Sequence, residues 1–157
     1  MRFFLFFLFL FLLISKSFAD VTDLIEGKAA DDRIYVGLFS YHIHPESRRN
    51  DNATNNQLGL SYEGWFAITF KNSFYHQTYA AGVQRSIYTH KITNRFDFNL
   101  GYRAGFIYGY DGRMSELFEK IKVMPGILPY LNFQSKKMGI ELQYMITAFT
   151  AGFYYIF

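Results

Sequence analysis

Cysteine is absent from this chain of 157 residues, and proline (3 residues) and tryptophan (1 residue) are rare. The absence of cysteine excludes disulfide bonds and thiolate metal sites, and it is compatible with export. Beyond the N-terminus, no apolar run approaches the roughly 20 residues of a membrane-spanning helix. The only helical periodicity is a short amphipathic segment at 21–30. These absences argue against a helical fold.

The N-terminus carries the single long apolar run. Met1 and Arg2 precede twelve apolar residues at 3–14, and small residues follow up to Ala19. This order is typical of a secretory signal peptide. The alternative, a transmembrane helix, would need about 30 Å of hydrophobic length, which twelve residues do not provide. We expect residues 1–19 to be removed and residues 20–33 to form a periplasmic lead-in.

Little net charge remains once this segment is removed. The chain has 16 Lys and Arg, of which Arg2 and Lys16 lie in the signal, so 14 remain against 13 Asp and Glu. The pI of 9.0 for the whole sequence therefore indicates no nucleic-acid partner. The remaining hydrophobicity comes from Tyr and Phe, which suits the wall of a β-barrel.

From Ile34 onward, apolar and polar residues alternate in segments separated by turn residues, which indicates β-strands. We predict eight strands at 34–44, 57–62, 65–70, 78–88, 96–110, 121–133, 138–146 and 149–157. Their connections alternate in length, because those at 45–56, 71–77 and 111–120 are long and the intervening ones are mostly short. An even strand number with such alternation is typical of a transmembrane β-barrel with its long loops outside.

The last predicted strand ends at Phe157 with alternating aromatic residues. In lipid this strand must pair with the first, because an unpaired edge leaves backbone groups unsatisfied. In the first strand, alternation places Tyr35, Phe39, Tyr41 and Ile43 on one outward face. We therefore predict an all-β, eight-stranded antiparallel transmembrane barrel at 34–157, monomeric and in the bacterial outer membrane. A secreted, lipocalin-like soluble barrel is the alternative, and it would have a polar exterior.

Strand direction places a histidine and a serine at the same rim. His42 ends the first strand and Ser73 follows the third, and both strands run toward the long loops. A histidine beside a hydroxyl is the minimal pair for acyl transfer, because the imidazole accepts the proton of the attacking oxygen. Alternatively, both are ordinary rim residues. His42 and His44 could also chelate a metal on one strand face, but no third ligand is evident, and we expect neither metal nor cofactor.

Residues around Ser73 resemble a known family, the outer-membrane lipid A palmitoyltransferases of the PagP family. Segment 65–74, WFAITFKNSF, is similar to the family's apolar strand ending Phe-Lys-Asp-Ser-Trp. Segment 35–42, YVGLFSYH, resembles the first strand of that family, which ends in an aromatic residue and the catalytic histidine. Shorter similarities follow in the same order, including Ala81-Gly82, 125–129 and Gln143-Tyr144, so the resemblance spans the whole predicted barrel.

The resemblance implies a barrel that transfers an acyl chain from a glycerophospholipid to lipid A. It assigns His42 as the general base, Ser73 as the rim serine, and Asn72 to the position of the family's aspartate. It also implies that Gly82 and Gln84 lie at the floor of an apolar acyl well. Pro125 and Pro129 would help to open a lateral gap in the wall, since proline cannot donate to a strand ladder.

Two departures from the family pattern bear on function. Asn72 lacks the negative charge of aspartate, and Gln84 replaces a glycine at the expected floor of the well. Both favour the second hypothesis, a non-catalytic small barrel with a structural or partner-binding role. A third hypothesis is phospholipid hydrolysis, in which water replaces the lipid acceptor.

Overall fold

A computed structural model describes residues 26–113, 119–145 and 147–157. The expected signal peptide and the first part of the lead-in, up to residue 25, lie outside the described residues. The described elements are β1 (Lys28–Ala29), β2 (Arg33–His42), α2 (Pro45–Asn50), β3 (Leu58–Tyr62), β4 (Trp65–Lys71), β5 (Gln77–Lys91), β6 (Phe96–Tyr108), β7 (Val123–Ser135), β8 (Met138–Met145) and β9 (Ala148–Ile156).

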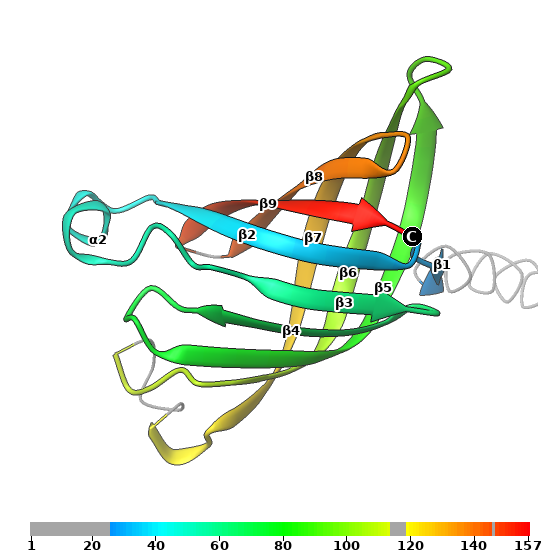
Figure 1. Cartoon of the computed structure of the whole chain (residues 1–157). Coiled ribbons are helices and arrows are strands. Elements are labelled where there is room, and N and C mark those ends of the chain that lie inside the picture. Colours follow the sequence, from blue (N-terminus) through cyan, green and yellow to red (C-terminus); the bar gives the residue numbers. More distant parts are fainter. Residues whose placement is uncertain (1–25, 114–118, 146) are drawn as a thin grey trace, which may run out of the picture.

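Eight antiparallel strands close into a barrel, as the alternation predicted (Figure 1). Each strand from β2 to β9 pairs with the next in sequence, and β9 pairs back with β2 from Arg33↔Ile156 to His42↔Ala148. This last pairing closes the sheet on itself, so that the barrel has no edge strand. The short β1 lies beside β5, where Lys28 pairs with Ser86.

The two ends of the barrel differ in their connections. One end, which we call the loop end, carries connections 43–57, 72–76, 109–122 and 146–147, and the first of these contains α2. The opposite turn end carries only short connections, at 63–64, 92–95 and 136–137. Glu63 and Gly64 both have positive φ (49° and 77°), as a two-residue hairpin turn requires.

A β-bulge at Gly37 corrects one prediction for β2. Tyr35 is buried inside the barrel (1% exposed), whereas Phe39, Tyr41 and Ile43 lie on the outside, so these four residues do not share a face. The register of β2 against β9 shifts between Val36 and Leu38, and Gly37 has φ +68°. The extra residue reverses the alternation, so Leu38 and His42 point inward.

The exterior of the barrel is apolar and the interior is largely polar. Exposed aliphatic and aromatic side chains occur on the outside of every barrel strand, among them Val36, Leu60, Trp65, Tyr79, Phe106, Ile127, Ile140 and Phe153. Inside, Arg33, Gln84, Arg103, Asn132 and Glu141 are buried. No helix in the described parts of the chain has the length and hydropathy to cross a membrane.

Candidate active site

His42 and Ser73 meet at the loop end. His42 is the last residue of β2 and is 3% exposed, and Ser73 lies in the connection between β4 and β5. His42 Nε2 lies 2.9 Å from Ser73 Oγ, which is hydrogen-bond distance. If the neutral ring carries its proton on Nδ1, Nε2 can accept the serine proton. The pair thus has the geometry of a base and a hydroxyl nucleophile.

Asn72 is fully buried, and its side-chain amide forms hydrogen bonds with backbone groups around the turn that carries Ser73. Its Oδ1 accepts hydrogen bonds from the N–H groups of Phe74 (2.9 Å) and His76 (3.1 Å). Its Nδ2 donates to the carbonyl oxygen of Gly109 at 2.9 Å. Asn72 therefore shapes the 72–76 connection and ties it to the start of the 109–122 connection.

A carboxylate that the sequence analysis did not single out lies beside His42. Asp51 Oδ2 is 3.9 Å from His42 Nε2, and the Asp51 side chain is 20% exposed. Asp51 and Ser73 approach the same ring nitrogen, so this arrangement differs from a triad in which the acid binds Nδ1. Asp51 lies in an irregular loop, where neither periodicity nor spacing predicts which side chain a residue will contact.

His42, Ser73 and Asp51 line a rim pocket of about 250 Å³. Deeper in the barrel is an apolar cavity of about 300 Å³, whose lining includes Leu38, Phe66, Ile68, Phe70 and Leu128. Leu38, Phe70 and Met145 line both spaces, so the rim pocket adjoins the apolar cavity. A chain-shaped apolar ligand in the cavity would have its polar end at the His42–Ser73 pair.

Arg103 lines the apolar cavity among its few polar groups. Its Nε donates to Gln84 Oε1 at 2.9 Å, and its Nη2 pairs with Glu141 Oε1 at 2.8 Å. Gln84 Oε1 also accepts a hydrogen bond from the Tyr35 hydroxyl at 2.9 Å. The cavity lining includes Ala80 and Arg103 but neither Gly82 nor Gln84, so Gln84 lies behind Arg103 and supports it.

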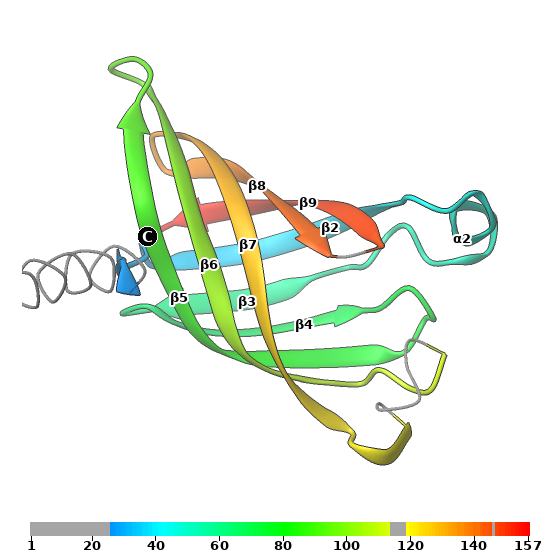
Figure 2. The same cartoon turned by 180° about the vertical axis from the view of Figure 1, so that it is seen from behind.

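The barrel wall opens between β7 and β8 toward the loop end. The pairing of these strands runs from Ser135↔Met138 to Tyr130↔Gln143 and stops there, one residue before Pro129. Figures 1 and 2 show β7 diverging from β8 beyond this point. Pro125 and Pro129 lie an even number of residues apart in β7, so the N–H groups that they lack would both have pointed to the same edge of the strand.

The apolar cavity reaches this opening. Its lining includes Pro125 and Ile127, whose side chains lie on the outer surface of β7, and Tyr144 on β8. Ile127 is 77% exposed, more than any other large apolar side chain in the described parts of the barrel. The cavity is therefore continuous with the outside of the barrel through the wall.

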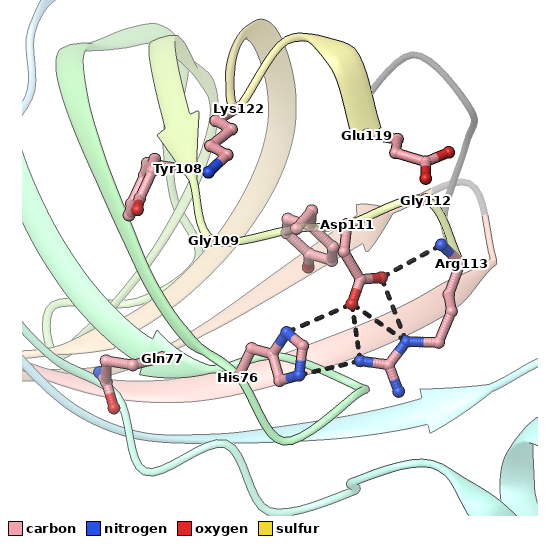
Figure 3. Close-up of a pocket in the computed structure, with 10 residues that line it drawn as sticks. His76, Gln77, Tyr108, Gly109, Asp111, Gly112, Arg113, Glu119 and Lys122 are labelled. Atoms are coloured by element: carbon pink, nitrogen blue, oxygen red, sulfur yellow. Dashed lines mark hydrogen bonds and ion pairs between the residues drawn. The ribbon is translucent and has the colours of Figure 1, made fainter.

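A second polar cluster joins the connections at the loop end (Figure 3). Asp111 Oδ2 lies 2.8 Å from Arg113 Nη2 and 3.3 Å from His76 Nδ1. Hydrogen bonds from the Arg113 guanidinium hold the pKa of the Asp111 carboxyl below its usual value. The Arg113 guanidinium also stacks on Phe74, 4.6 Å from the ring centroid, and lines the rim pocket.

Tyr110 adds a protonated phenol to the rim pocket. Burial raises the pKa of Tyr110 to about 12, because the phenolate would lose its hydration. The hydroxyl therefore stays protonated at neutral pH.

His44, in contrast, is exposed at the rim. In the described part of the chain, no three His, Asp or Glu side chains gather in a way that could hold a metal ion.

Fold and site together define an eight-stranded β-barrel with a histidine–serine pair above a laterally open apolar cavity. No model of a protein family matches the sequence, and a search of curated proteins finds no significant match.

Proposed function

We propose that the protein is an outer-membrane acyltransferase that moves an acyl chain from a glycerophospholipid to lipid A. The observation that carries the proposal is the position of the His42–Ser73 pair, 2.9 Å apart, at the mouth of an apolar cavity that opens sideways through the wall. The apolar exterior supports insertion in a bilayer, because large apolar side chains surround the barrel. Lipid A as acceptor rests on the resemblance of segments 35–42 and 65–74 to the PagP family.

The donor lipid enters through the opening between β7 and β8. Its acyl chain leaves the bilayer and occupies the apolar cavity, where Phe66, Ile68 and Phe70 replace neighbouring lipid chains. Its glycerol ester then lies in the rim pocket with His42 and Ser73. Lateral entry spares the polar head group from crossing the apolar cavity, which would cost several kcal/mol for each unpaired polar group.

Acyl transfer proceeds in two steps. In the first step, Ser73 Oγ attacks the ester carbonyl carbon while His42 Nε2 takes the serine proton. The bond from that carbon to the glycerol oxygen then breaks, and His42 gives the proton to the glycerol oxygen. A lysophospholipid leaves and the acyl chain remains on Ser73. A lipid A hydroxyl then gives its proton to His42 and its oxygen attacks the acyl carbon, and Ser73 recovers the proton as it departs.

The test uses the purified barrel in detergent with radiolabelled phospholipid and lipid A, and chromatography of the lipid products. We expect labelled lipid A from the wild type and a loss of about 10²-fold or more in His42→Ala and Ser73→Ala, the range for a general base or nucleophile. His90→Ala is the matched control, because His90 is exposed near the turn end of β5. No transfer by the wild type, or equal transfer by all four proteins, refutes the proposal.

One observation favours the second candidate function, a non-catalytic barrel with a structural or partner-binding role. The Asn72 side chain, at the position of the family's aspartate, makes its hydrogen bonds to the backbone of the loops. The same assay separates the alternatives, since a structural barrel yields no labelled product. Free labelled fatty acid without acylated lipid A would instead identify phospholipid hydrolysis.

A further inference from the structure

We infer that Asp51 is the acidic positioning residue for His42 and that Asn72 has a structural role in its place. This inference rests on the proposed function, because it concerns how His42 acts as a base. The Asn72 amide is bonded to the N–H groups of Phe74 and His76 and to the Gly109 carbonyl. The side chain at the position of the family's aspartate therefore shapes the 72–76 connection in this chain.

The Asp51 carboxylate is held where a charge can act on the ring. Asp51 follows α2, and its N–H donates to the Ser47 carbonyl oxygen at 2.8 Å, which fixes the backbone at the end of the helix. Its Oδ2 lies 3.9 Å from His42 Nε2, and the His42 ring is almost fully buried. The Asp51 carboxylate therefore lies next to the nitrogen on which positive charge develops when the serine proton is transferred.

The two loops that carry Asp51 and Ser73 are bonded to each other. The Asn52 N–H donates to the Ser73 carbonyl oxygen at 2.8 Å. Asn55 Nδ2 donates to the Lys71 carbonyl oxygen at 2.7 Å, and Asn55 Oδ1 accepts from the Ser40 hydroxyl at 2.6 Å. These bonds connect the loop that carries Asp51 to β2, to the end of β4 and to Ser73. The carboxylate and the hydroxyl are thus set at one ring nitrogen by the same set of hydrogen bonds.

A second aspartate of this rim, Asp111, is engaged elsewhere. Asp111 pairs with Arg113 and His76, and Arg113 lines the rim pocket together with His42. Asp51 therefore supplies the negative charge next to His42. Asp51 Oδ2 lies 3.9 Å from Nε2, which is beyond hydrogen-bond distance, so Asp51 acts on His42 through its charge and is a positioning residue.

The experiment compares Asp51→Asn, Asp51→Glu and Glu46→Gln with the wild type. Glu46→Gln is the matched control, because it removes the same charge from an exposed position in the same connection. We expect kcat for acyl transfer to fall about tenfold or more in Asp51→Asn with KM little changed, as for the loss of support to a general base. Asp51→Glu should recover part of kcat, and Glu46→Gln should keep the wild-type value.

A second readout needs no acceptor lipid. An alkyl fluorophosphonate reacts with an activated serine when Oγ displaces fluoride from phosphorus and the serine proton passes to the base. We expect Asp51→Asn to slow labelling of Ser73 about tenfold, with thermal unfolding by circular dichroism showing an intact barrel. A wild-type rate of transfer and labelling in Asp51→Asn overturns the role of Asp51 and leaves the proposed function standing. An unreactive wild type in both assays overturns both.

Discussion

At the scale of single residues, one glycine decides which way His42 faces. Residues 33 and 35 of β2 point into the barrel, and strict alternation would then send residue 42 outward. The bulge at Gly37, with φ +68°, reverses the alternation and brings His42 inward to Ser73. The contact between His42 and Ser73 therefore depends on the backbone conformation of Gly37, five residues before His42.

We expect Gly37→Ala to lower the free energy of unfolding by about 1–2 kcal/mol, the cost of a left-handed conformation for a residue with a side chain. A Cβ at this position would meet no atom within 4 Å, so the cost comes from the backbone and not from a clash. Gly37→Asn should cost less, because asparagine tolerates positive φ. Urea unfolding in lipid vesicles measures both, and an alanine variant as stable as the wild type contradicts this account.

Residue identities predicted part of the site. His42 and Ser73 could be placed at one rim from strand direction and from the resemblance to the PagP family. Asp51 could not, because its contact with His42 depends on how an irregular loop folds back on β4. The sequence also placed Asn72 beside Ser73 at this rim. Only the structure shows that the Asn72 amide bonds to the backbone of the loops.

At the scale of elements, β7 determines access to the interior. Its half toward the turn end pairs with β8, whereas its half toward the loop end pairs with β6 alone. Two of the three prolines in the chain lie in that second half. Proline lacks the N–H that a ladder to β8 would need. Leaving this edge unpaired therefore costs less free energy here than elsewhere in the wall.

We expect a disulfide across the opening to block lipid entry. The register of Tyr130 with Gln143 places Pro129 opposite Tyr144, and the chain has no cysteine to interfere. Pro129→Cys/Tyr144→Cys should lose most acyl transfer when oxidised and regain it when reduced, as measured by the lipid assay. The matched control is Leu131→Cys/Leu142→Cys, which crosslinks residues already paired. Equal transfer in both oxidised forms would show that lipids enter by another route.

At the scale of the whole molecule, the barrel interior has two parts of opposite character. The half toward the loop end holds the apolar cavity and the rim pocket. The half toward the turn end holds a buried ionic network, in which Glu141 lies between Arg103 (2.8 Å) and Arg33 (3.7 Å). The charged half thus fills the barrel beneath the cavity and would limit how deep the acyl chain of the proposed donor could reach.

We expect Glu141→Gln to lower the free energy of unfolding by about 3–5 kcal/mol, because it leaves two buried guanidinium groups without their shared carboxylate. Glu63→Gln, at an exposed hairpin turn, should change it by less than about 0.5 kcal/mol. Urea unfolding in lipid vesicles compares the two variants. Similar stabilities would mean that water or another group compensates the buried arginines.

The sequence by itself determined the strand number, the alternating loop lengths and the apolar exterior, because each follows from local periodicity and turn residues. It also placed His42 and Ser73 at the same rim through strand direction. Only the tertiary structure decided the inward turn of His42, the position of Asp51, the support of Arg103 by Gln84 and the point along β7 at which pairing with β8 ends. These features depend on a bulge, on loop contacts and on where a ladder ends, which all arise from pairing between distant segments.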